Sequence, residues 1–84
     1  MLAEAKMHRG NAQPLSRLRR GDRGVIERID PSDRRKLRKL MAMGVFPGAP
    51  VRVVQTFPAY VFCVGFTQVA VDREMAEYIS VRPE

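Results

Sequence analysis

The sequence predicts a small, mainly β domain: a barrel of about five short strands interrupted by one short amphipathic helix. The chain has 84 residues, 45% of them hydrophobic, which is enough for one modest core. Short runs rich in β-branched residues alternate with glycine and proline turns, and one segment near the middle has apolar residues at helical spacing. Because closure removes exposed strand edges, we expect a closed or partly open barrel.

The N-terminal part of the chain differs in character from the rest. Residues 1–13 are polar and lack periodicity, which is typical of a loosely held tail. We therefore expect the domain to span residues 14–84. After a turn-rich stretch at 19–22, residues 24–29 form the first predicted strand, because they are rich in β-branched side chains.

The segment after this strand has the signals of a helix start. Asp30 is the expected N-cap, and Pro31 takes the first helical position, where its missing N–H costs nothing. Leu37, Leu40 and Met41 follow at spacings of three and four and form an apolar stripe. The remaining arc of the helix is basic, with Arg34, Arg35, Lys36, Arg38 and Lys39.

Two glycines mark the end of this helix and the turn that follows it. Gly44 is predicted to take the left-handed conformation after the helix, so that Val45 can fold back on Leu40. Pro47 and Gly48 fit the central positions of a type II turn, which leads into a strand at 51–54. A phosphate-binding glycine loop is the competing interpretation, but the lysine motif of such loops is absent and the helix precedes the glycines.

The second half of the chain reads as strands around a core. Tyr60, Phe62, Val64 and Phe66 alternate on one face of a strand at 61–66, and we expect that face in the core. Further strands are predicted at 69–71 and 78–81, with a single helical turn at 72–77. Three methionines at apolar positions, Met41, Met43 and Met75, are assigned to the core as flexible gap-fillers.

The net charge of +6 is distributed unevenly. Residues 1–40 carry twelve Lys and Arg against five Asp and Glu, whereas residues 41–84 carry three against four. The first half could therefore meet nucleic acid, anionic lipid or an acidic protein surface. No apolar run reaches the about 20 residues of a membrane span, and the N-terminus lacks the apolar stretch of a secretory signal.

No metal centre or catalytic centre is predicted. Tight transition-metal sites need clustered ligands, but the one histidine, His8, lies in the predicted tail, and the one cysteine, Cys63, lies in a hydrophobic run. Cys63 lacks a nearby histidine base and cannot form an internal disulfide, which favours a cytoplasmic, reducing location. Asp72 and Glu74 could contact Fe²⁺ or another divalent metal weakly at the surface. We expect no enzyme activity and no resident cofactor.

The basic helix is the first candidate for a partner-binding surface. Arg34 with Arg38, and Arg35 with Lys39, form like-charge pairs at i, i+4, each destabilising by about 0.2–0.5 kcal/mol. Such a helix is compatible with an anionic counterpart, and equally with a solvated face.

The aromatic loop at residues 57–60 is the second candidate. Proline between aromatic residues can form a shallow apolar patch for a partner. For Phe57, packing at one mouth of the barrel is slightly favoured over exposure. For Tyr60, packing and exposure to a partner are equally compatible with the sequence. The predicted partner-binding residues are Arg34, Arg35, Arg38, Lys39, Phe57 and Tyr60.

Two stretches of the sequence, in this order, resemble a known family. The first is Leu-x-x-Met-Gly-Val-x-Pro-Gly-x-x-Val-x-Val, which begins at Leu40. The second is Phe-Thr-Gln-Val-Ala-Val-Asp-Arg-Glu-Met-Ala-Glu-Tyr-Ile-x-Val, which begins at Phe66. Together they resemble the FeoA family, the small cytosolic companion of the bacterial ferrous-iron transporter. The likeness covers roughly residues 14–82.

The resemblance implies an SH3-like barrel without enzymatic activity, and a partner, FeoB, a membrane protein whose cytosolic G domain binds guanine nucleotide. We expect this chain to support ferrous-iron uptake by contact with that G-protein portion. It would be cytoplasmic, reaching the inner face of the membrane through the transporter. Whether it forms a homo-oligomer stays open.

Related domains form the C-terminal barrels of metal-dependent repressors. A basic SH3-like module for nucleic-acid binding or metal-responsive regulation is therefore the alternative. The 84 residues leave little room for the DNA-binding helices of such a repressor, which favours the transport role.

Overall fold

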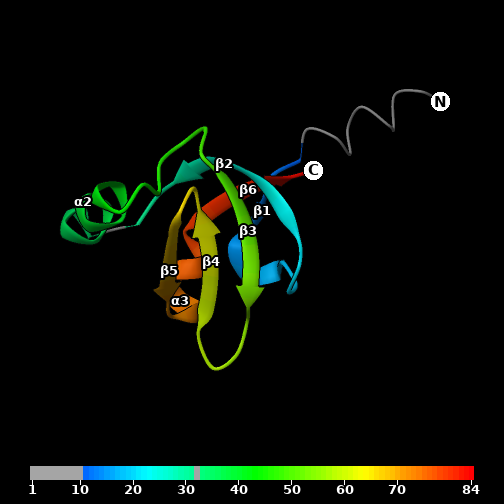
Figure 1. The fold of residues 1–84 in the computed structure, drawn as a ribbon. Helices are drawn as coiled ribbons and strands as arrows, with labels where there is room; N and C mark the ends of the chain where they lie inside the picture. The colour runs from blue at the N-terminus through cyan, green and yellow to red at the C-terminus, as the bar shows by residue number, and fades with distance from the viewer. Residues whose placement is uncertain (1–10, 32) are drawn as a thin grey trace.

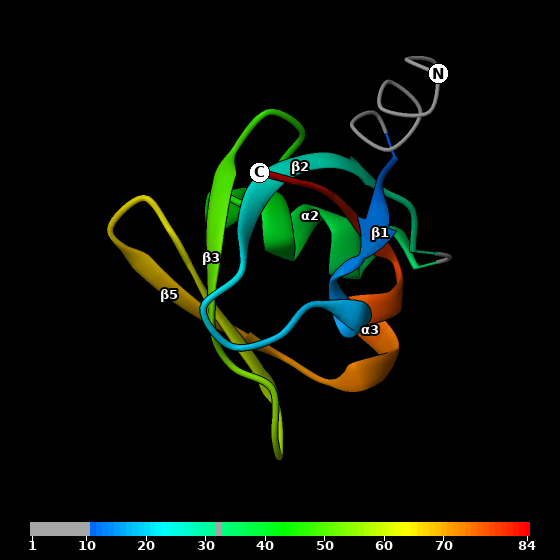
Figure 2. The same cartoon turned by 90° about the vertical axis from the view of Figure 1, so that its right-hand side faces the viewer.

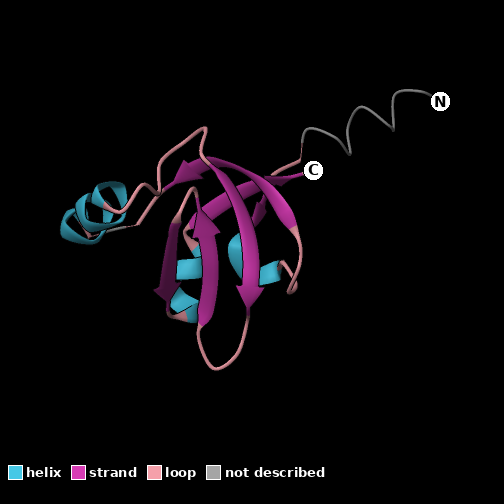
Figure 3. Cartoon of the chain, viewed as in Figure 1, coloured by secondary structure: helices cyan, strands magenta, loops and turns pink. Residues whose placement is uncertain are grey.

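The computed structural model describes residues 11–31 and 33–84, and their fold is mainly β (Figure 1). Six antiparallel strands form one sheet in the order β1-β6-β2-β3-β4-β5. The strands are β1 (Gln13–Pro14), β2 (Arg23–Ile29), β3 (Pro50–Gln55), β4 (Tyr60–Val64), β5 (Thr67–Val71) and β6 (Ile79–Pro83). The helical elements are the 3₁₀ helix η1 (Leu15–Arg17), α2 (Arg34–Ala42) and α3 (Arg73–Glu77) (Figure 3). The predicted mainly β fold with a short amphipathic helix is confirmed.

The sixth strand, β1, was not predicted. It has two residues, and Gln13 and Pro14 are opposite Val81 and Ser80 of β6. A strand this short carries no periodicity that a sequence pattern could detect. The predicted tail at residues 1–13 concerns mainly residues 1–10, which lie outside the described residues, while Gln13 already belongs to the sheet.

The core lies where the sheet curves around a common interior (Figure 2). Each central strand contributes its inward side chains, such as Ile26, Val53, Phe62 and Val81, which are all buried. Burial of each large apolar side chain stabilises the fold by about 1.5–3 kcal/mol. Buried and half-buried residues alternate along β4, and its three inward positions are buried as predicted.

Phe66 does not belong to this core, so its prediction as a core residue is wrong. It is fully exposed, because β4 ends at Val64, which pairs directly with Thr67 of β5. Gly65 and Phe66 therefore form a two-residue hairpin loop. Gly65 has a φ of +60°, which a two-residue loop with glycine first requires. Strand alternation no longer applies inside the loop, and Phe66 projects outward.

The end of α2 follows the predicted geometry. Gly44 has a φ of +94°, and its N–H donates to the Met41 carbonyl at 3.0 Å. The N–H of Val45 donates to the Leu40 carbonyl, also at 3.0 Å. These two bonds make a Schellman motif, and Val45 is buried beside Leu40.

The turn after the helix is also confirmed, and it is bonded to the sheet. Gly48 has a φ of +95°, and the Ala49 N–H donates to the Phe46 carbonyl at 3.0 Å, as in a type II turn. Gly48 donates to the Ile26 carbonyl at 2.7 Å, and Ile26 donates to the Ala49 carbonyl at 2.9 Å. The turn is therefore held against β2.

The predicted helix start at Asp30 is wrong. The N-cap is Asp33, whose carboxylate accepts a hydrogen bond from the Arg35 N–H at 2.8 Å. Asp30 instead donates its backbone N–H to the Tyr78 carbonyl at 2.9 Å, directly after the pairing of Ile29 with Ile79. The long-range strand pairing continues through Asp30, so the helix begins later than the local capping signals indicate.

Replacement of the two aspartates should distinguish the true cap from the false one. We expect Asp33→Ala to lower the free energy of unfolding by about 1 kcal/mol, because an unpaired N–H is left at the helix start. Asp30→Ala changes the charge equally but removes no capping bond, so it should stay within about 0.5 kcal/mol of the unmodified protein. Urea unfolding followed by circular dichroism measures both. A larger loss for Asp30→Ala would contradict this assignment.

A second prediction concerns Gly24, where β2 and β6 approach each other closely. A Cβ atom at this position would lie 2.6 Å from the Arg82 carbonyl oxygen and 2.6 Å from a Val81 methyl carbon. We expect Gly24→Ala to destabilise the fold by about 1–3 kcal/mol, because the backbone must shift to accept the methyl group. Gln68→Ala, on the exposed edge strand β5, is the control and should change stability by less than about 0.5 kcal/mol. Equal unfolding midpoints would argue against close packing at Gly24.

Candidate partner-binding site

Helix α2 lies to one side of the sheet (Figure 1). Among its residues, Leu40 is buried and Leu37 is half-buried, while Met41 is 47% exposed. The prediction that Met41 belongs to the core is therefore wrong, whereas Met75 on α3 is buried as predicted, and Met43 packs against the core from a half-buried position. The helix is attached to the domain mainly by one buried side chain and by the corner that follows it.

The outer surface of α2 is basic. Its exposed cations are Arg34, Arg35, Lys36, Arg38 and Lys39. Within residues 11–31 and 33–84, Arg82 and Glu27 form an ion pair with a nitrogen–oxygen distance of 3.5 Å, and no ion pair involves a residue of α2. Arg34 and Arg35 lie in the first turn, where the helix macrodipole disfavours cations, and no acidic residue accompanies them there. Apart from the Asp33 carboxylate at its N-cap, the helix therefore carries a positive surface whose cations form no ion pair within the described residues.

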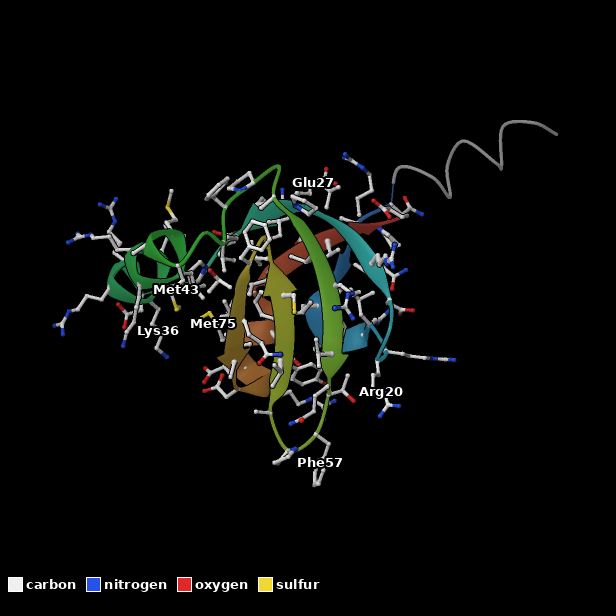
Figure 4. The ribbon with its side chains drawn as sticks, in the orientation of Figure 1. Arg20, Glu27, Lys36, Met43, Phe57 and Met75 are labelled. Atoms are coloured by element: carbon white, nitrogen blue, oxygen red, sulfur yellow. The ribbon has the colours of Figure 1, made fainter. Side chains whose placement is uncertain are left out.

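A groove of about 420 Å³ separates α2 from the segment that joins β5 to α3. Its walls are formed by Lys36, Lys39, Leu40, Met43, Ala70, Val71, Asp72 and Met75. Lys36, Met43 and Met75 lie near one another in Figure 4. The floor is apolar and the α2 side is cationic. No local pattern could have located this groove, because the residues of α2 and those from Ala70 to Met75 line it together only in the folded chain.

The aromatic loop lies at a different place from α2. Phe57 is 83% exposed at the turn between β3 and β4, so the favoured expectation that it packs at a barrel mouth is wrong. Tyr60 is only 8% exposed, and its hydroxyl donates to the Ser16 carbonyl at 3.1 Å. Figure 4 shows Phe57 and Lys36 far apart in the molecule. The predicted contact residues therefore do not form one continuous surface.

The residues weighed as metal ligands do not converge. Cys63 is half-buried on β4, opposite Arg52 of β3. Asp72 caps α3, where its carboxylate accepts the Met75 N–H at 2.8 Å. In the part of the chain that the structure describes, no three His, Cys, Asp or Glu side chains gather as a metal-binding group, and His8 lies outside that part. In the same part, no helix is long and apolar enough to cross a membrane.

Solved structures with the same fold include an iron uptake regulatory protein named FeoA. Its crystal structure superposes with a TM-score of 0.78 at 28% identity, over 88% of this chain and 99% of that one. The crystal structure of FeoA from Stenotrophomonas maltophilia, described as an SH3 domain protein complexed with zinc, gives a TM-score of 0.74 at 24% identity. That match covers 89% of this chain and 96% of the other. The SH3-like fold is therefore confirmed.

The fold also occurs within a larger regulator. A manganese-dependent transcriptional repressor matches with a TM-score of 0.80 at 25% identity, over 87% of this chain but 42% of the repressor. Comparison with curated proteins gives no match. A family model described as the FeoA domain matches residues 13–83. Because that match spans almost the whole described part, this chain belongs to the FeoA family.

Proposed function

We propose that this protein acts in ferrous-iron transport as a non-enzymatic accessory that binds the cytosolic G-protein portion of a FeoB-type membrane transporter. The positive charge of α2, whose cations form no ion pair within the described residues, carries this proposal. Arg35 and Lys39, one turn apart, repel each other, and no carboxylate of the described residues pairs with either. An acidic partner surface would turn this local cost into an attraction.

The position of the helix supports the same contact. Its attachment through Leu40 and the following corner leaves the basic surface exposed. The groove beside Lys36 and Lys39 adds apolar area from Met43 and Met75. Apolar anchors inside a charged rim are typical of protein–protein contacts, since the apolar part supplies affinity and the rim supplies the association rate. The transporter's G-protein portion would therefore contact α2 and this groove.

A nucleic-acid-binding role is the second candidate, because the fold also forms part of a transcriptional repressor and α2 is basic. Single-stranded nucleic-acid sites commonly combine cations with exposed aromatic side chains on which bases stack. Here Tyr60 and Phe62, the aromatic residues of β4, are buried. This arrangement favours the protein partner.

Charge reversal on α2 should abolish the protein contact. We expect Arg35→Glu with Lys39→Glu to weaken binding of the full chain to the purified G-protein portion of the transporter by at least about tenfold, through loss of charge complementarity. Arg19→Glu with Arg20→Glu is the matched control, with the same charge change on a distant loop, and it should retain most of the affinity. Biolayer interferometry at moderate salt measures all three proteins. Retained binding by the α2 variant, or equal loss by the control, would contradict the proposal.

The nucleic-acid alternative has a direct test. We expect the purified protein to bind random duplex or single-stranded DNA and RNA only weakly at moderate salt, because it lacks an aromatic stacking surface on β4. Fluorescence anisotropy over a range of salt concentrations measures this. Micromolar affinity at moderate salt, with a steep salt dependence from phosphate contacts, would favour the alternative instead.

A further inference from the structure

A second basic surface lies on the β2–β3 side of the molecule, away from α2. We call it the arginine strip, and its members are Arg17, Arg19, Arg20, Arg23 and Arg52, all of which are exposed. None of these five residues belongs to the partner-binding set predicted from the sequence. Their clustering depends on long-range pairing, because Arg52 comes from a different strand.

Backbone hydrogen bonds hold the strip together. The Gly21 N–H donates to the Val53 carbonyl at 2.8 Å, and the Val53 N–H donates to the Asp22 carbonyl at 2.8 Å. The loop that bears Arg19 and Arg20 is therefore fastened along β3. Arg23, the first residue of β2, is the direct cross-strand neighbour of Arg52 on β3.

The strip concentrates positive charge at a local cost. Like charges directly opposite each other on neighbouring strands destabilise a sheet, and Arg23 and Arg52 face each other in this way. Asp22 is nearby, and its carboxylate accepts the Arg19 N–H at 2.8 Å. A hollow of about 420 Å³ lies beside these two arginines, and Gly65 and Glu84 also line it, so this part of the strip faces the β4–β5 turn. Anionic groups bound along the strip would reduce the repulsion between the arginines. Phosphate groups suit this site, because guanidinium groups bind phosphate through paired N–H donors.

Phe57 extends this surface at its end. It lies at the turn between β3 and β4, and its side chain is 83% exposed. The bond from the Tyr60 hydroxyl to the Ser16 carbonyl joins this turn to the segment that bears Arg17. Figure 4 shows Phe57 and Arg20 at the same end of the molecule. The projecting ring therefore lies at the same end of the molecule as Arg20, whereas Arg23 and Arg52 lie nearer the β4–β5 turn.

The two other exposed phenylalanines lie at the other end of the sheet from Phe57. Phe66 lies in the turn after β4, and Phe46 lies in the connection before β3. Successive turns of an antiparallel sheet lie at opposite ends, so both belong to the end opposite Phe57. A nucleic-acid strand would need several neighbouring rings for stacking, whereas this end offers a single projecting ring. A single exposed ring with arginines at the same end of the molecule suits insertion between lipid headgroups.

We propose that the Phe57 end of this protein docks on an anionic phospholipid bilayer, with Arg17, Arg19 and Arg20 of the arginine strip on the headgroup phosphates and the Phe57 ring in the interfacial layer. Each basic residue near an anionic membrane surface contributes about 1 kcal/mol of attraction, so several together give reversible binding. Helix α2 stays exposed in this arrangement. The bilayer contact does not depend on the transporter contact, and both can form at once.

Tryptophan reporters test which end inserts. The chain has no tryptophan, so Phe57→Trp and Phe66→Trp each place a unique fluorophore at one end of the full-length protein. With phosphatidylcholine vesicles containing about 30% phosphatidylglycerol, we expect a blue shift and reduced quenching by aqueous iodide for Phe57→Trp, and no change for Phe66→Trp. Pure phosphatidylcholine vesicles should change neither. A shift at Phe66→Trp alone, or at neither residue, would overturn the proposal.

Charge neutralisation tests the strip itself. In vesicle sedimentation with the same anionic lipid, we expect Arg19→Gln with Arg20→Gln to lower partitioning by at least about tenfold. Arg34→Gln with Arg35→Gln on α2 removes the same charge and should leave partitioning within about twofold. Equal losses in both variants would indicate non-specific attraction and refute a docking end.

A competition experiment separates lipid from nucleic acid as the partner. Addition of single-stranded oligonucleotide at matched phosphate concentration should leave most of the protein on the vesicles. Complete displacement by the oligonucleotide would identify nucleic acid as the preferred partner and overturn the bilayer proposal. Because the vesicles contain no protein, a failure here leaves the test of the transporter contact unaffected.

Discussion

The bonding of the α2–β3 corner to β2 is the constraint on which the rest of the structure depends. Ile26 uses both its backbone groups on this corner, accepting from Gly48 at 2.7 Å and donating to Ala49 at 2.9 Å. Val45 is buried next to the turn, so the end of α2 is attached to the core as well as to the sheet. With its end held there, a short helix is directed away from the sheet, and its cations face the surroundings.

Charge in this small domain is separated into two surfaces by the fold. The cations of α2 come from one continuous helix, whereas the arginine strip is assembled from η1, the loop that follows it and two strands. Asp22 and Glu84 lie beside the strip and Asp33 caps α2, but within the described residues no cation of either surface forms an ion pair. Two basic surfaces in different places would let one small protein meet the two anionic partners proposed above.

Prediction from the sequence succeeded where the determining interactions are local. The glycine at the end of α2 and the type II turn at Gly48 follow from backbone conformations that neighbouring residues determine. The prediction of the helix start failed. The pairing of Ile29 with Ile79 and the hydrogen bond from Asp30 to Tyr78 keep this segment in the sheet, in spite of its local capping signal. The prediction that Phe66 lies in the core failed for a related reason, because the register of β4 with β5 decides which residues form the hairpin loop.

The features of the candidate site also separate into those that local sequence determines and those that long-range contacts determine. The sequence by itself determined the mainly β class, the corner after the helix and the basic composition of α2, because these depend on spacing and backbone preference within a few residues. Only the tertiary structure decided that Phe57 and α2 lie apart, that Tyr60 is buried against η1, and that Arg23 meets Arg52. Contacts between distant segments arise from strand register and core packing, and one residue's shift in register would place a different set of side chains on each face.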